Sequence, residues 1–203
     1  CRKELKKMLG KNHAISATSV AVIGKLTYDY GVQNQWVSPT IQEFCNQVYQ
    51  RAVQPLESLG ITNQVLLWSI LFVPYIFGTL LPDVDSPNSL LGRWIYIPVE
   101  HRGATHTIWA LGILVIATIG LPIVIPIAVG YFVHLWLDDL SRSGICWWYP
   151  ISQYREYNGG ARVKKGFHLW IYRTGQPSEY VFVTLLVVTA LLMLYLKYPF
   201  LQD

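Results

Sequence analysis

The chain has 203 residues and a net charge of +4; it is 52% apolar and only 14% charged, whereas ordinary soluble domains are about 25% charged. Asp, Glu, Lys and Arg are absent from residues 58–82, 103–137 and 180–196. Three scattered cysteines without a C-x-x-C pair argue against a disulfide framework. The pattern excludes a disordered chain, a disulfide-rich secreted scaffold and a dedicated nucleic-acid binder, and it predicts an integral membrane protein.

The N-terminal region begins with a basic head, CRKELKKMLGK. The next segment, residues 13–30, is rich in small residues and interrupted by Lys25 and Asp29. It is poor in leucine and lacks a small-x-small cleavage site, so we expect a short span or a packed helix rather than a signal peptide. Residues 31–63 are mostly polar and predict a surface connection with one or two amphipathic helices.

Two spans are clear from apolar length. Residues 64–81 (QVLLWSILFVPYIFGTLL) predict one, in which Pro74 is expected to produce a kink because it removes a backbone donor. Residues 180–196 (YVFVTLLVVTALLMLYL) predict the last, followed by Lys197 and Tyr198 as interfacial anchors.

Residues 107–137 form an apolar stretch that is too long for one crossing and short for two. Gly120, Pro122 and Pro126 lie in its middle. We therefore predict a helical hairpin of two short spans, with a re-entrant pair as the alternative.

Orientation follows from the tendency of Lys and Arg to remain on the cytoplasmic side. The basic head places the N-terminus in the cytoplasm, and five crossings then place residues 83–106 and the basic juxtamembrane loop 140–178 on that side. Residues 31–63 and the C-terminus lie outside. The predicted fold class is an all-α, polytopic membrane helical bundle of four or five spans, forming one domain over residues 1–203.

Ionisable side chains gather at the predicted span ends, although each costs about 2.5–3.5 kcal/mol at membrane depth. These ionisable side chains come from three short motifs, which are L-P-D-V-D, H-R-G-A-T-H and H-L-W-L-D-D. The candidate metal ligands are His13, Asp83, Asp85, His101, His106, His134 and Asp138. Singly, acids after a helix end and an H-x-x-x-D ion pair are ordinary features, but three clusters at one depth predict a cytoplasm-facing metal site.

Imidazole and carboxylate donors suit zinc, with manganese as the alternative. Seven candidates are too many for one ion and enough for two, with Asp83 or Asp85 as a bridge. Two ions about 3.5–4 Å apart polarise a phosphoryl oxygen and lower the pKa of a bound water. The expected chemistry is phosphoester hydrolysis. His168 stands apart and is interpreted as a surface or interface histidine.

Several motifs resemble a known family. G-T-L-L-P-D-V-D, H-R-G-A-T-H-T, G-Y-F-V-H-L-W-L-D-D-L and S-G-I-C-W-W-Y-P, within residues 71–150, resemble the bacterial LexA-regulated, membrane-bound metal-dependent hydrolases, the YdjM-like family. Residues 13–24, a histidine followed by a small-residue helix, add to it. The resemblance implies a multi-span bacterial inner-membrane protein with a metal-dependent hydrolase site. His134 with Asp138 is distantly similar to zinc-dependent phospholipase C, but the second H-x-x-x-E pair of those enzymes is missing, which puts a three-metal cluster in doubt.

Supporting roles follow from neighbouring side chains. Arg102 is expected to clamp a phosphate or to anchor a headgroup. Glu100 or Asp139 is expected to orient a ligating imidazole, with a general base as the alternative for Glu100. Trp147, Trp148 and Tyr149 predict part of an interfacial aromatic belt.

The expected partners are membrane lipid and a phosphoester substrate such as a phospholipid or lipid-linked phosphate. Anionic headgroups are expected at the basic stretch from Arg142 to Arg173. Nucleic acid is not expected, and self-association into a homo-oligomer stays open. Two rival functions use the same side chains: a cation or proton transporter, and a membrane scaffold with a structural metal.

Overall fold

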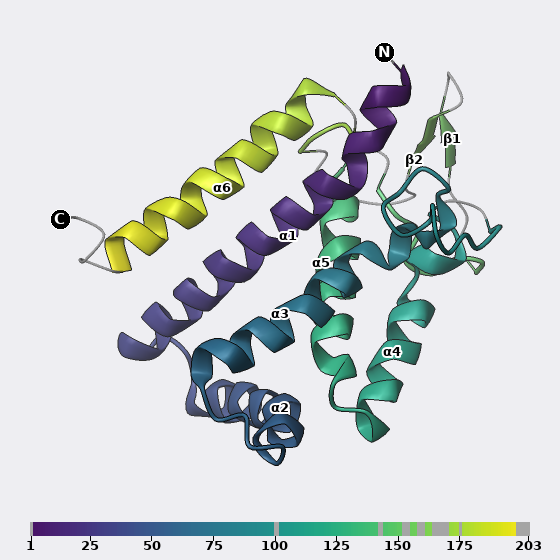
Figure 1. The fold of residues 1–203 in the computed structure, drawn as a ribbon. Helices are drawn as coiled ribbons and strands as arrows, with labels where there is room; N and C mark the ends of the chain where they lie inside the picture. The colour runs from purple at the N-terminus through teal and green to yellow at the C-terminus, as the bar shows by residue number, and fades with distance from the viewer. Residues whose placement is uncertain are drawn as a thin grey trace.

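A computed structural model describes residues 2–99, 102–141, 144–151, 155–157, 161–163, 171–174 and 176–197. In this part the chain is predominantly helical (Figure 1). The helices are α1 (Arg2–Gln33), α2 (Pro39–Glu57), α3 (Gln64–Leu80), α4 (Ile108–Gly120), α5 (Val124–Leu140) and α6 (Pro177–Lys197). Two short 3-10 helices, η1 (Pro82–Asp85) and η2 (Ala104–His106), and two strands, β1 (Arg155–Tyr157) and β2 (Ala161–Val163), complete the order.

The structure confirms most of the predicted elements. The first segment is one long helix, α1, and the polar connection contains one helix, α2, whose Ala52 and Val53 pack against Leu67 and Leu71 of α3. The central apolar stretch is a helical hairpin, α4 and α5.

The all-α class is confirmed, and the structure adds one short antiparallel hairpin, β1 and β2, within the basic loop. The sequence between these strands reads Asn-Gly-Gly. Asn-Gly is a strong signal for a tight hairpin turn, since both residues tolerate positive φ.

Helix α5 lies at the centre of the bundle and contacts α3, α4 and α1, while α6 runs along α1 (Figure 1). Helix α2 lies across the other end of the bundle, and the remaining five helices alternate in direction along the chain (Figure 1). The N-terminal ends of α1, α4 and α6 therefore meet the C-terminal ends of α3 and α5 at one end of the bundle. We call this the site end, because every candidate ligand that the structure describes lies on a segment that reaches it.

Two glycines allow α3 and α5 to approach closely. A Cβ atom on Gly78 would lie 2.2 Å from the carbonyl oxygen of Ile127, and one on Gly130 would lie 2.1 Å from that of Tyr75. Both obstacles are backbone atoms, which cannot rotate away. The glycines therefore set the spacing of the two helices, and the same seam carries His134 beside Thr79.

We expect Gly130→Ala to destabilise the protein by about 1–3 kcal/mol, the usual cost of forcing extra volume into a packed core. The matched control is Gly112→Ala on α4, where an added Cβ meets nothing within 4 Å. That change should be neutral or stabilising by up to about 1 kcal/mol, because alanine favours a helix. Thermal unfolding in detergent compares the two. Equal melting temperatures would contradict the close approach of α3 and α5.

Among the residues that the structure describes, two helical segments are long and apolar enough to cross a membrane by length and composition. These are Gln64–Asp85, with a mean hydropathy of 1.9, and Pro177–Lys197, with 2.1. Helix α4 is apolar but shorter. Only 11% of the most apolar part of α6 is buried against the protein, so most of its aliphatic surface faces outward. The number of spans and their orientation stay predictions.

Candidate metal centre

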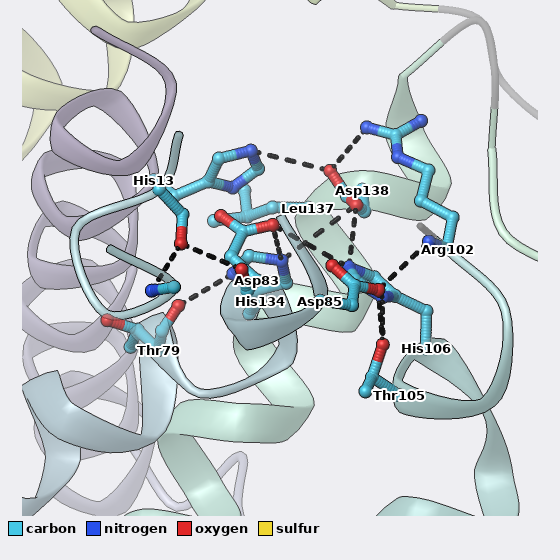
Figure 2. A network of polar contacts seen from close by, with 12 residues as sticks. His13, Thr79, Asp83, Asp85, Arg102, Thr105, His106, His134, Leu137 and Asp138 are labelled. Carbon is cyan, nitrogen blue, oxygen red and sulfur yellow. Dashed lines mark hydrogen bonds and ion pairs between the residues drawn. The ribbon is translucent and has the colours of Figure 1, made fainter. Parts of the chain in front are cut away.

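Six ionisable side chains from four segments meet inside the site end of the bundle (Figure 2). All of them are at least nine-tenths buried. They are His13 of α1, Asp83 and Asp85 of η1, His106 of η2, and His134 and Asp138 of α5. Segments far apart in the sequence thus bring together the residue types predicted to bind a metal.

The orientation of His134 is fixed by the end of α3. The last carbonyl groups of a helix have no partner within it, and Pro82, which has no N–H, ends α3 in this sequence. The carbonyl oxygen of Thr79 is 2.6 Å from Nδ1 of His134. Because a carbonyl only accepts, Nδ1 carries the hydrogen, and the lone pair of His134 is on Nε2.

The Nε2 lone pair of His134 faces two carboxylates, which also carry lone pairs. Nε2 of His134 is 3.7 Å from Oδ1 of Asp83 and 3.8 Å from Oδ2 of Asp138. It is buried without a hydrogen-bond partner. Neither an ionised carboxylate nor this nitrogen has a hydrogen to donate, so a cation between them is the partner that fits their chemistry.

His106 is oriented by a second relay. The hydroxyl of Thr105 donates to Oδ2 of Asp85 at 2.5 Å and lies 3.0 Å from Nδ1 of His106. Since the one hydroxyl hydrogen is used by Asp85, Nδ1 of His106 donates to Thr105, and the lone pair of His106 is also on Nε2. Burial lowers the pKa of His106 below its ordinary value, which keeps the imidazole neutral, as a metal ligand must be.

Nε2 of His106 faces the same two carboxylates. Nε2 of His106 is 3.8 Å from Oδ1 of Asp83 and 3.5 Å from Oδ2 of Asp138, matching the distances from Nε2 of His134. Ligands at about 2.0–2.1 Å from a tetrahedral zinc ion are about 3.3–3.4 Å apart. We call these four atoms the donor set; their nitrogen-to-oxygen distances are longer than in a zinc shell, so the side chains would have to move closer together to hold the ion.

His13 lies beside this set. Its ring stacks on His134 with centroids 4.5 Å apart, and its Nε2 is 3.4 Å from Oδ1 of Asp138. Its Nδ1 is buried without a hydrogen-bond partner. The preceding residue, Asn12, donates to the buried Glu179 of α6 at 3.0 Å, which fixes α1 against α6 at the level of His13.

Arg102 spans the outer side of the centre. Its NH2 donates to Oδ1 of Asp138 at 2.9 Å, and its NH1 donates to Oγ of Ser141 and to the carbonyl oxygen of Gly144, both at 3.3 Å. Its backbone N–H donates to Oδ2 of Asp85 at 3.2 Å. The residue has a φ of 62°, in the left-handed region, so this backbone turn is part of how the site is assembled.

The structure places the other predicted site residues as follows. His101, Glu100 and His168 lie outside the described residues. Asp139 is half-buried in the last turn of α5. Asp85 contacts the Nδ1 side of His106, at 3.4 Å, rather than the nitrogen that faces the donor set.

The groups that orient the ligands were not predicted from the sequence; they are Thr79, Thr105, Ser141, Asn12 and Glu179. Thr105 directly precedes His106, so its hydroxyl could have been predicted to contact that imidazole. The Thr79 carbonyl and the Asn12–Glu179 pair had no local signal.

We expect Thr105→Val to weaken metal binding about 10–100-fold, the usual effect of removing a group that orients a ligand. Valine keeps the shape of threonine but cannot link Asp85 to Nδ1 of His106. The control is Thr118→Val on α4, where the hydroxyl bonds only within its own helix, to the carbonyl oxygen of Val115. Titration with zinc in competition with a chelator measures both affinities. Unchanged zinc affinity in Thr105→Val would show that the Thr105 hydroxyl does not orient His106.

A family model described as "YdjM inner membrane protein" matches residues 8–200. "Inner membrane protein YdjM" from Escherichia coli (strain K12) and from Shigella flexneri are both 36% identical over 87 residues, covering 34% of this chain and 44% of each relative. The match thus spans less than half the length of these relatives. No solved structure matches the chain.

Proposed function

The chain belongs to the YdjM inner membrane protein family, and for this membrane protein we propose a metal-dependent hydrolase that cleaves a phosphoester bond. The observation that carries the proposal is the set of buried lone pairs on His134, His106, Asp83 and Asp138. The Nδ1 hydrogens of His134 and His106 point away from these lone pairs, toward Thr79 and Thr105.

We assign one divalent ion to these four donors, with zinc favoured over manganese by the imidazole content. The geometry argues for one ion rather than two. His134 has a single lone pair for both groups of donors that could hold a metal, His13–His134–Asp138 and Asp83–His106–His134. The second oxygen of Asp138 already accepts from the Arg102 guanidinium, whose positive charge opposes another cation there.

A divalent ion in such a site supplies Lewis acidity toward a phosphoryl oxygen and lowers the pKa of water. The protein's own groups supply the rest. Arg102 holds Asp138 by one oxygen and leaves the other for the donor set. Nε2 of His13 lies 3.4 Å from Oδ1 of Asp138, and its Nδ1 has no hydrogen-bond partner, so the Nδ1 lone pair of a neutral His13 is placed to accept a proton from the attacking water.

A transporter fits the sequence less well. Ionisable groups inside the bilayer mark proton and cation paths. Asp, Glu, Lys, Arg and His are absent between His13 and Lys25 in α1, throughout α3 and α4, before His134 in α5, and between Glu179 and Lys197 in α6. The ionisable groups near the bundle core therefore gather at the site end, which favours chemistry at one membrane face.

The test combines metal content with turnover. We expect purified protein reconstituted with zinc to hydrolyse a member of a panel of phosphomonoesters and phosphodiesters, both soluble and lipid-linked. His13→Ala should lower kcat by about 100-fold or more, as loss of a general base does, while the zinc content stays the same. If the metal-loaded protein hydrolyses no member of the panel, the hydrolase proposal is wrong, and a structural role for the metal is favoured.

A further inference from the structure

An unusually exposed apolar run lies on the loop between η1 and η2. Trp94, Ile95, Tyr96 and Ile97 are consecutive, and all four are exposed, Trp94 by 87%. Isolated exposed apolar residues are normal, but a contiguous patch marks a surface that contacts something apolar. This patch joins the two segments that carry Asp83 and His106.

The loop is fixed to the metal centre by backbone contacts. The N–H of Ile97 donates to the carbonyl oxygen of Val84 at 3.2 Å, between the two aspartates of η1. Oγ of Ser89 donates to the carbonyl oxygen of Asp83 at 2.7 Å. Nε of Arg93 donates to the carbonyl oxygen of Ser89 at 3.1 Å. The apolar run is therefore held at a set position relative to the donor atoms.

Two more tryptophans lie at the same end. Trp109, in the first turn of α4, and Trp148 are both exposed, and their rings meet edge to face with centroids 5.7 Å apart. The N–H of Ile108 donates to the carbonyl oxygen of Trp147 at 2.9 Å, which joins the two segments. We call these exposed residues the aromatic rim: Trp94, Ile95, Tyr96, Ile97, Trp109 and Trp148.

The opposite end of the bundle carries its own exposed aromatics and basic residues. They are Tyr30, Trp36 and Trp68, with Lys25 and Lys197 paired to Asp29. The surface between the two ends is aliphatic, with Ile113, Ile116 and Ile119 of α4 and Leu185, Val188 and Leu192 of α6 exposed. The 21 residues of α6 measure about 31 Å, close to the roughly 30 Å of a hydrocarbon core.

We propose that the aromatic rim lies in the headgroup layer of the leaflet beside the metal centre and brings lipid phosphate groups to that centre. Tryptophan and tyrosine favour this depth because their rings are apolar with one polar atom. Exposed Arg93 and Arg173 at the same end attract anionic headgroups. The substrate class is then an anionic glycerophospholipid or another lipid-linked phosphate, and this last step rests on the proposed hydrolase function.

The placement of the rim is tested without any activity. A Trp94→Cys variant, in a background with the three native cysteines replaced by serine, is labelled with an environment-sensitive fluorophore in vesicles of phosphatidylethanolamine and phosphatidylglycerol. Gln47→Cys on the exposed polar side of α2 and Ile116→Cys in the middle of α4 provide the water and hydrocarbon references. We expect aqueous iodide to quench the Trp94 label less than the Gln47 label. A nitroxide lipid with a shallow probe should quench the Trp94 label more than a deep one does. Quenching like that at Gln47 would overturn the proposal.

Turnover tests the substrate class separately. Trp94→Ser should lower kcat/KM about tenfold for a phospholipid in these vesicles and leave a soluble phosphodiester unaffected, because only the lipid depends on the rim for access. Equal loss on both substrates would overturn the role in lipid delivery. If neither substrate is cleaved, the proposed hydrolase fails, and the fluorescence result alone decides whether the rim contacts lipid.

Discussion

Purified wild-type protein is expected to carry about one equivalent of zinc or manganese, and His134→Ala is expected to lose it. Removing a group that merely orients a ligand costs about 10–100-fold in affinity, so removing a ligand should cost at least about 100-fold. His134 is central because its Nε2 faces Asp83 and Asp138 while its Nδ1 is held by Thr79. Elemental analysis and chelator competition measure the loss.

The controls separate metal loss from misfolding. Asp138→Asn keeps the shape of the side chain and should also abolish stoichiometric binding, whereas Asp29→Asn, at the opposite end of the bundle, should retain it. Zinc at 100 times its dissociation constant should stabilise the wild-type protein by about 2.7 kcal/mol and should not stabilise His134→Ala. Wild-type protein without a stoichiometric transition metal, or a metal-loaded His134→Ala variant, would refute the centre.

Arg102→Ala is expected to destabilise the protein by about 3–5 kcal/mol, the usual cost of leaving one member of a buried ion pair without its partner. The Arg102 and Asp138 side chains are 12% and 2% exposed, and their atoms are 2.9 Å apart. Chemical unfolding in detergent measures the change. A phosphate clamp, the role expected from the sequence, predicts instead a loss of activity with little change in stability.

Two further variants identify the cause. Arg102→Ala combined with Asp138→Asn removes both charges, so most of the stability should return while metal binding does not. Arg102→Gly should be about 1–2 kcal/mol more stable than Arg102→Ala, because only glycine adopts a left-handed backbone without strain. If the double variant is as unstable as Arg102→Ala, the ion pair is not the source of the effect.

Local sequence was enough to predict the candidate ligands. His13, Asp83, Asp85, His106, His134 and Asp138 were singled out because ionisable groups beside long apolar segments are costly, and the structure brings these six together. The helical hairpin was predictable because Gly120 and Pro122 interrupt an apolar stretch. The β-hairpin was missed although Asn-Gly-Gly is a local turn signal.

The separate roles of those residues depended on contacts between distant segments. Asp83 and Asp85 are two residues apart and chemically alike, yet Asp83 faces the lone pairs of both His106 and His134, and Asp85 contacts the other side of His106. Arg102 was expected to clamp a phosphate or anchor a headgroup, and in the structure its guanidinium donates to Asp138. No periodicity or spacing distinguishes these cases.

The sequence by itself determined that the chain is apolar, helical and equipped with nitrogen and oxygen donors at span ends, because composition and periodicity act locally along the chain. Only the tertiary structure decided which lone pairs converge. The carbonyl of Thr79 meets His134 because Gly78 and Gly130 bring two helices together across 55 residues of sequence. The direction of a lone pair depends on the partner of the opposite nitrogen, and that partner comes from another helix.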